Sequence, residues 1–120
     1  MIVGGSLVAA VFLLLKFVFV VSVVVGESMT PTLQPWDFCV LRRTAPYEPR
    51  KEEIVMFRTA DDPPLHLIKR VVGLPGEEVA GAVVPAGKVY VKGDNADSWQ
   101  GLVATRLVTA RLLWHWRWRR

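Results

Sequence analysis

The fold of this chain is decided most clearly by residues 65–77, which read LHLIKRVVGLPGE. The first part of the stretch is rich in Leu, Ile and Val, and the Gly, Leu, Pro and Gly that follow are typical of a turn. Side chains alternate between the two faces of a strand, so Leu67, Lys69 and Val71 share one face and Arg70 lies on the other. The stretch therefore predicts a β-strand that ends at a tight turn.

Similar short runs recur along the chain and predict a mainly β fold. Prolines and glycines separate the runs at short intervals, which is typical of an all-β domain. With 120 residues, the chain has room for one small domain. We expect strands at residues 38–41, 53–58, 65–72, 78–80 and 88–92.

The N-terminal segment, residues 2–25, is almost entirely apolar, and Lys16 is its one charged side chain. A helix needs roughly 20 apolar residues to cross the ~30 Å hydrocarbon core of a bilayer. A removed signal peptide would have a basic region before the apolar run and a small-residue cleavage site after it, and this segment has neither. We therefore expect one transmembrane helix over residues 1–25, with a cleaved targeting segment as the alternative. The β domain would then span residues 26–114, followed by a basic Trp/Arg tail at 115–120.

Composition excludes several classes of protein. Cys39 is the single cysteine of the chain, so neither an internal disulfide nor a structural zinc site with several thiolates can form. The formal net charge of +4 would fit nucleic-acid binding. However, the surplus lies mostly in a C-terminal run beside tryptophans, and the apolar N-terminus favours a membrane. We expect membrane lipid as a partner and no nucleic acid.

Two residues suggest catalytic chemistry. Ser28 follows the apolar segment directly, and an X-Pro turn at Pro31 would hold its hydroxyl in a fixed, partly exposed position. Lys69 lies between two apolar residues on its face of the predicted strand, so loss of hydration would lower its pKa. A neutral lysine amine near a serine can activate the hydroxyl as a nucleophile. Taken singly, Ser28 could equally be a turn serine and Lys69 a protective edge-strand lysine.

A third polar element follows the strand predicted at residues 88–92. The turn there reads Gly93-Asp94-Asn95-Ala96-Asp97-Ser98 and holds two carboxylates, an amide and a hydroxyl. Such groups can orient a neighbouring lysine or serine through hydrogen bonds. An ordinary Gly-Asp-Asn turn is the alternative interpretation.

Together the three elements resemble the type I signal peptidase family, the membrane-anchored Ser/Lys proteases. The shared pattern is an apolar N-terminus, then Ser28-Met29-x-Pro31, then the Lys-Arg-Val-Val-Gly-Leu-Pro-Gly-Glu run from Lys69, then Gly93-Asp94-Asn95. Within the family the chain is most similar to the mitochondrial inner membrane protease subunits, because its motifs are close together and glycine stands at position 26. The resemblance implies a small signal-peptidase-like β domain that follows one N-terminal transmembrane helix.

The resemblance implies a role for each site residue. Ser28 would be the nucleophile and Lys69 its general base, with the backbone N–H of Ser28 as an oxyanion donor. Gly26 stands where many bacterial relatives have a serine that also donates to the oxyanion. Three further residues, Asp94, Asp97 and Ser98, would support the catalytic pair. Met29 and Pro31 would contact the substrate. No metal or cofactor is implied.

The resemblance also implies a biological setting. The expected activity is that of a membrane-anchored serine endopeptidase that removes signal or sorting presequences from precursor proteins. A second protease subunit of the same family is the expected partner. The expected location is the mitochondrial inner membrane, with the β domain facing the intermembrane space. A bacterial plasma membrane or a plastid membrane is the alternative.

The sequence departs from the family after Asn95. Asp97 and Ser98 match the family's Asp-Ser pair, but the extra serine that often orients the lysine is missing, and so is the arginine that pairs with the aspartate. This shorter turn favours a second hypothesis, in which the chain is a catalytically weak or inactive paralogue and a structural subunit of a protease complex.

The C-terminal tail lies beyond the resemblance. In an extended strand, Trp114, Trp116 and Trp118 share one face, beside several arginines. Tryptophan and arginine both favour the membrane–water interface, so the tail predicts a second membrane contact. A frayed end after Trp114 is the alternative.

Overall fold

The computed structural model describes residues 3–44 and 46–117, which form one helix, nine strands and a short 3-10 turn. The elements in chain order are α1 (Val3–Val18), β1 (Phe19–Val23), β2 (Phe38–Arg43), β3 (Ile54–Arg58), β4 (His66–Gly73), β5 (Glu78–Val79), β6 (Ala82–Val83), β7 (Lys88–Lys92), β8 (Gln100–Ala104), η1 (Thr105–Leu107) and β9 (Val108–Trp116). The expected mainly β architecture is confirmed.

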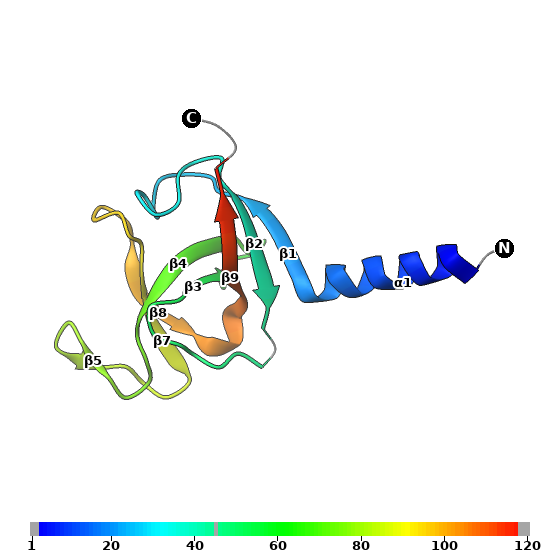
Figure 1. Cartoon of the computed structure of the whole chain (residues 1–120). Helices are drawn as coiled ribbons and strands as arrows, with labels where there is room; N and C mark the ends of the chain where they lie inside the picture. Colours follow the sequence, from blue (N-terminus) through cyan, green and yellow to red (C-terminus); the bar gives the residue numbers. More distant parts are fainter. Residues whose placement is uncertain (1–2, 45, 118–120) are drawn as a thin grey trace.

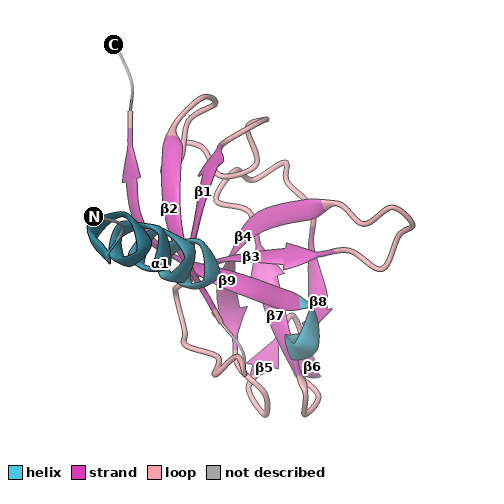
Figure 2. Cartoon of the chain, turned by 90° about the vertical axis from the view of Figure 1, so that its right-hand side faces the viewer, coloured by secondary structure: helices cyan, strands magenta, loops and turns pink. Residues whose placement is uncertain are grey.

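Seven of the strands form one antiparallel sheet in the order β1-β2-β9-β3-β4-β7-β8, and β5 pairs with β6 in a separate hairpin. Figures 1 and 2 show how strongly the sheet curls, so that strands far apart in its order lie around a common interior. Each of the five expected strand regions contains a strand, and residues 78–80 begin the β5–β6 hairpin. The sequence pattern did not predict β1, β6, β8 or β9 as separate strands.

We expected the apolar N-terminal segment to form one helix, and this prediction is wrong. The helix ends at Val18, and residues 19–23 form β1, which pairs with β2 from Phe19↔Arg42 to Val23↔Phe38. This part of the segment is rich in β-branched valine, which favours a strand, and pairing with β2 satisfies its backbone groups. Over the described residues, α1 is too short to qualify as a membrane-spanning helix.

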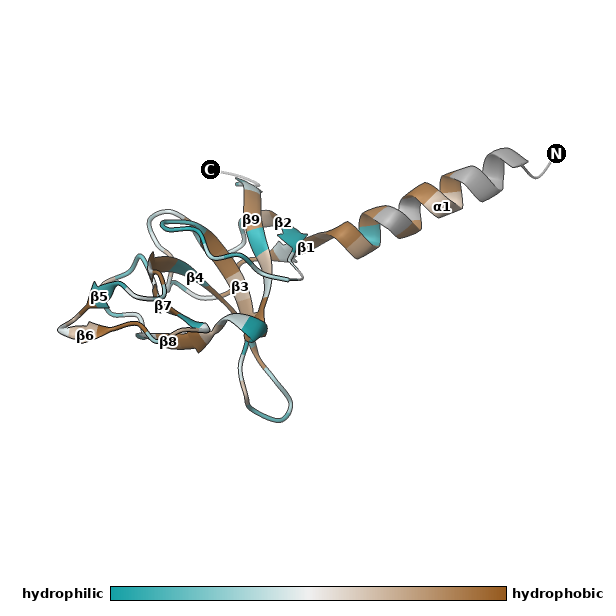
Figure 3. Cartoon of the chain, turned by 90° about the horizontal axis from the view of Figure 1, so that it is seen from below, coloured by the Kyte–Doolittle hydropathy of each residue, from teal (hydrophilic) through white to brown (hydrophobic). Residues whose placement is uncertain are grey.

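Helix α1 projects away from the sheet in Figures 1 and 3. Its described side chains include several exposed large apolar groups, and Figure 3 colours most of the part of the helix nearer the sheet as hydrophobic. Examples are Val8, Leu13, Leu15 and Phe17, of which Phe17 is 75% exposed. The helix therefore presents an apolar surface that the β domain leaves uncovered.

The core lies on both sides of β3. Ile54 and Met56 belong to one buried cluster, whereas Val55 and Phe57 belong to a second. A strand that is buried on both faces supplies alternate side chains to two cores, and here the curled sheet folds over both of them. The next strand in the sheet, β4, pairs with β3 from His66 to Arg70 and contains Lys69.

Candidate active site

Lys69 lies in the middle of β4, opposite Val55 of β3. Its neighbours on the same face, Leu67 and Val71, belong to the second core cluster, as the alternation predicted. Lys69 is only 5% exposed, and within the described residues it forms no ion pair. Burial lowers its pKa below the ordinary value of 10.5, because desolvation disfavours the ammonium form.

The amine of Lys69 has one hydrogen-bond partner among the described side chains. Its Nζ lies 2.5 Å from Oγ of Ser98, which comes from the turn between β7 and β8. Ser98 is one of the expected supporting residues, and its hydroxyl contacts the lysine although the family's extra serine is absent from this turn. Ser98 lies against Lys69 even though the turn is short, because β4 and β7 are paired neighbours and the turn leaves the end of β7.

Ser28 lies in the loop between β1 and β2 and is half-buried. The loop is fastened to the turn after β7 by Asn95. The backbone N–H of Asn95 donates to the carbonyl of Ser28 (2.9 Å), and its side-chain amide donates to the carbonyl of Glu27 and the hydroxyl of Thr30 (both 3.1 Å). The backbone of Ser28 is thus held on both sides by a residue that is distant in sequence.

Gly93 brings the serine loop and the lysine together. A Cβ at this position would lie 2.5 Å from the carbonyl oxygen of Ser28 and 2.3 Å from Oγ of Ser98. Any side chain would therefore separate the Ser28 backbone from the hydroxyl that contacts Lys69. Ser28 Oγ and Lys69 Nζ share no direct hydrogen bond within the described structure.

Asp94 lies on the other side of this turn and contacts neither Ser28 nor Lys69. Its carboxylate accepts two hydrogen bonds from Arg70, at 2.9 and 2.8 Å, and a third from the hydroxyl of Thr32 at 2.5 Å. The Arg70 hydrogen bonds lower the pKa of Asp94, and the same contacts raise the pKa of Arg70. Asp94 thus joins β4, the turn and the serine loop.

A groove of about 190 Å³ opens beside Ser28. Its walls include residues 22–25, at and just after the end of β1, then Ser28 and Met29, and the start of β4 (residues 66–68). β1 is an edge strand, and β4 pairs with β7 only from Arg70 onward. Two strand edges therefore border the groove, and an extended peptide could add to either.

The other predicted site residues are spread around this centre. Gly26 has a φ of +89°, in the left-handed region that favours glycine, two residues before Ser28. Pro31 is exposed and does not line the groove, although its carbonyl accepts a hydrogen bond from Arg117. Asp97 is exposed, and its backbone N–H donates to the side chain of Asn95.

Three residues of the site were not in the predicted set: Thr32, Arg70 and Asn95. Each holds two segments together rather than facing the groove, so the family motifs contained Arg70 and Asn95 without indicating a role for them. Asn95 follows Asp94 in the Gly-Asp-Asn turn, and Arg70 follows Lys69, so adjacency to a predicted residue was the available signal.

The model of the family "Signal peptidase, peptidase S26" matches residues 2–106. The chain belongs to this family. The matched span includes Ser28, Lys69 and Ser98. It ends within η1, before β9.

Curated relatives include organellar and bacterial proteins. The chain is 36% identical over 109 residues to the mitochondrial ATP-independent inner membrane protease subunit 1b of Arabidopsis thaliana, covering 74% of this chain and 64% of that protein. It is 36% identical over 104 residues to the probable signal peptidase I-2 of Synechocystis sp., covering 78% and 46%. A third relative is the mitochondrial inner membrane protease subunit 1 of Xenopus tropicalis, 29% identical over 85 residues, covering 61% and 51%. The match thus spans about half to two thirds of each relative.

Proposed function

We propose that this peptidase S26 chain is a serine endopeptidase in which Ser28 is the nucleophile and Lys69 the general base. The observation that carries the proposal is the environment of Lys69. The lysine is buried, has no ion pair among the described residues, and donates to Ser98. The Ser98 hydroxyl and the Ser28 carbonyl both lie close to Gly93. A lysine in this setting is shifted toward the neutral amine that a base requires.

The reaction would proceed in two halves. Oγ of Ser28 attacks the scissile carbonyl while the neutral amine of Lys69 takes the hydroxyl proton. The resulting ammonium gives this proton to the leaving amine as the peptide bond breaks, which leaves an acyl ester on Ser28. A water then attacks the ester, Lys69 takes its proton, and the proton returns to Ser28 as the acid product leaves.

The backbone N–H of Ser28 supports this mechanism as an oxyanion donor. It donates to no acceptor within the described residues, and the contacts of Asn95 fix its peptide unit. Removal of a preorganised donor of this kind, aimed at the developing negative charge, typically lowers kcat by roughly 10²–10³-fold. Gly26 provides no side-chain donor, so a second donor would come from the backbone.

The groove supports a presequence as the substrate class. An extended peptide could lie between the edges of β1 and β4, and its side chains would alternate between the groove and solvent. The walls include Met29, Leu67 and Ile68, and the volume of about 190 Å³ suits small side chains near the scissile bond. Precursors with small residues before the cut are therefore the proposed substrates.

The apolar surfaces support a membrane location. Helix α1 would embed in a bilayer through its exposed apolar side chains, as a shorter anchor than the transmembrane helix over residues 1–25 that the sequence predicted. Trp114 and Trp116 are stacked on one face of β9 and are 56% and 46% exposed, which suits a second interfacial contact; Trp118 lies outside the described residues. By analogy with its organellar relatives, the proposed site is the mitochondrial inner membrane, with the β domain in the intermembrane space and a second subunit as partner.

A second candidate function is that of a weakly active or inactive structural subunit. Two observations favour it. Ser28 Oγ and Lys69 Nζ are not hydrogen-bonded in the described structure, and Asp97, which pairs with an arginine in the family pattern, is exposed and forms no ion pair with a described residue. In this case precursor would bind in the groove and remain intact.

Cleavage of a precursor peptide by the full chain in detergent separates the two candidates. The peptide would have small residues before the cut, and wild type would be compared with Ser28→Ala. Ser22→Ala is the matched control, because Ser22 lines the same groove from β1. Activity in wild type and Ser22→Ala, with loss in Ser28→Ala, supports the proposal. Binding without cleavage by wild type supports the structural subunit, and a fully active Ser28→Ala variant rules out Ser28 as nucleophile.

A further inference from the structure

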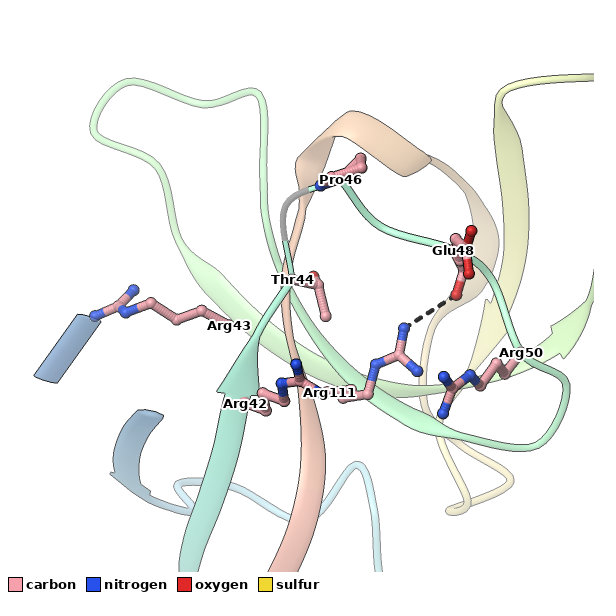
Figure 4. Close-up of a pocket in the computed structure, with 7 residues that line it drawn as sticks. All are labelled: Arg42, Arg43, Thr44, Pro46, Glu48, Arg50 and Arg111. Atoms are coloured by element: carbon pink, nitrogen blue, oxygen red, sulfur yellow. Dashed lines mark hydrogen bonds between the residues drawn. The ribbon is translucent and has the colours of Figure 1, made fainter. Parts of the chain in front are cut away.

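A second cavity, of about 350 Å³, lies away from Ser28 and is rich in arginine. It is formed by the end of β2, the loop that follows it and one residue of β9, and Figure 4 shows its lining. The lining residues are Arg42, Arg43, Thr44, Pro46, Glu48, Arg50 and Arg111. The lining thus contains four arginines and one glutamate.

Two of these arginines are placed against each other by the sheet. Arg42 of β2 lies directly opposite Arg111 of β9 in the antiparallel register, so both side chains leave the same face. Like charges in this position repel unless an anion lies between them. Arg111 is balanced by Glu53 at 3.4 Å, whereas Arg42 and Arg50 form no ion pair with any described residue.

Arg111 is held as a fixed wall of the cavity. Its guanidinium donates to the carbonyl of Glu48 (3.0 Å) and lies 5.5 Å from the centre of the Tyr47 ring. Figure 4 shows the side chains of Arg111 and Arg50 pointing toward one another across the cavity. Because Arg111 is already engaged by Glu48 and Glu53, Arg50 is the guanidinium of this pair that can turn its donors to the oxygens of a phosphate.

Thr44 adds an unused hydrogen-bonding group. Thr44 lines the cavity, and its hydroxyl oxygen is shielded from solvent without a hydrogen-bond partner among the described residues. A buried polar group without a partner is costly, and a change of side-chain rotamer would let this hydroxyl donate to an oxygen of a bound anion. The hydroxyl and the arginines thus point to the same ligand chemistry.

The cavity is also close to the end of α1. Nε of Arg43 donates to the carbonyl of Lys16, in the last turn of the helix, at 3.3 Å. Figure 4 shows the Arg43 side chain leaving the other arginines and reaching toward the helix. If α1 is embedded in a bilayer, as proposed above, this end of β2 lies at the level of the lipid head groups.

We propose that this arginine cavity binds a phosphate group, supplied by the head group of an anionic lipid. Arg42 and Arg50 provide the charge, Arg111 the fixed wall and Thr44 a directed hydrogen bond. The site is independent of the Ser28 chemistry, and only the lipid source of the phosphate rests on the proposed membrane location. A bound head group would hold the β domain in one orientation against the membrane.

Ligand binding to the full chain in non-ionic detergent micelles tests this site without reference to cleavage. The probes are dioctanoyl phosphatidylglycerol, dioctanoyl phosphatidylcholine and inorganic phosphate, each titrated while ³¹P NMR signals and the melting temperature are measured. We expect saturable binding of the anionic lipid that is tighter than that of the zwitterionic lipid. If inorganic phosphate binds as tightly as the anionic lipid, the phosphate site stands, but its source is solution and the lipid assignment is overturned.

Paired variants separate a built site from diffuse attraction. Arg42→Gln/Arg50→Gln should weaken binding about tenfold or more, because two charge-assisted hydrogen bonds are lost. Arg58→Gln/Arg106→Gln removes the same charge from exposed positions outside the cavity and should change the Kd less than about twofold. Thr44→Val keeps the charge and should weaken binding about fivefold. Equal losses in the two double variants, or no saturable binding by any probe, would overturn the proposal.

Discussion

Lys69 and Arg70 are neighbours in sequence with opposite surroundings. Lys69 is buried against the core with a serine hydroxyl as its partner, and burial lowers its pKa. Arg70 is held by a bidentate ion pair with Asp94, and that contact raises its pKa. The strand separates the two side chains because its faces alternate. Lys69 therefore loses its proton more readily than a solvent-exposed lysine, whereas Arg70 stays protonated.

Both residues contact the same turn after β7. Lys69 meets Ser98 on one face of β4, and Arg70 meets Asp94 on the other. The turn is therefore clamped from two sides, and Thr32 and Asn95 extend the clamp to the serine loop. The candidate base Lys69 therefore depends on Arg70 to hold the turn in position, and on its own burial for its lowered pKa.

Exchange of the lysine for arginine should have the largest effect. In Lys69→Arg the side chain cannot supply a neutral base, so kcat/KM for a precursor peptide should fall by at least about 100-fold. Lys92→Arg, at an exposed position of β7, is the matched control and should be near wild type. If Lys69→Arg cleaves at the wild-type rate, Lys69 has a structural role.

The reverse substitution at the neighbouring position, Arg70→Lys, should affect stability more than the rate of cleavage. Arg70→Lys keeps the charge but loses the bidentate contact, so the free energy of unfolding should drop by about 2 kcal/mol. Chemical denaturation monitored by tryptophan fluorescence measures this, with Arg58→Lys as a surface control. An unchanged denaturation midpoint would mean that the pair with Asp94 contributes nothing to the clamp.

Removal of the partner of Lys69 should have a smaller effect. Ser98→Ala takes away the hydroxyl that positions the amine, so kcat should fall about tenfold with little change in KM. Ser98→Thr restores a hydroxyl and should recover part of the rate. A Ser98→Ala variant whose KM rises while kcat is preserved would show that Ser98 acts in substrate binding.

The pH dependence follows from the shifted pKa values of Lys69 and Asp94. Cleavage should rise with pH as Lys69 deprotonates, at a pKa below 10.5. Between the lowered pKa of Lys69 and 10.5, the unfolded chain binds more protons than the native chain. The same holds between the lowered pKa of Asp94 and 3.8. The free energy of unfolding therefore rises with pH in both ranges. Lys69→Met should remove the alkaline slope in denaturation curves. A slope that persists in this variant would assign it to another group.

The ion pair of Arg117 with Asp37 provides the weakest case for comparison with Arg70. Its single 3.3 Å contact comes from an arginine side chain that is 39% exposed, against 25% for Arg70. Asp37 is buried, but it keeps the hydrogen bond from the backbone N–H of Gln34 when the arginine is removed. Arg117→Gln should therefore lower the free energy of unfolding by about 1 kcal/mol, less than Arg70→Lys. Thermal unfolding beside Arg70→Lys measures the difference, and a larger loss in Arg117→Gln would reverse the ranking.

Much of the fold could be predicted from local sequence. The strands β2, β3, β4 and β7 were marked by apolar, β-branched runs between Gly and Pro turns, and alternation placed Lys69 with Leu67 and Val71. The end of α1 could not be predicted in this way. A run of apolar residues satisfies a helix and a buried strand equally well, and only pairing with β2 decided for β1.

The sequence by itself determined the family, the β architecture and the residue types of the candidate site, because these depend on spacing and on side-chain chemistry. Only the tertiary structure decided which groups meet. It placed Ser98 against Lys69, gave Asp94 to Arg70 instead of the lysine, and fastened Ser28 to Asn95. These contacts join residues that are distant in sequence, and they depend on strand register and on the close approach that Gly93 allows. Neither the strand register nor this close approach can be predicted from the local sequence pattern.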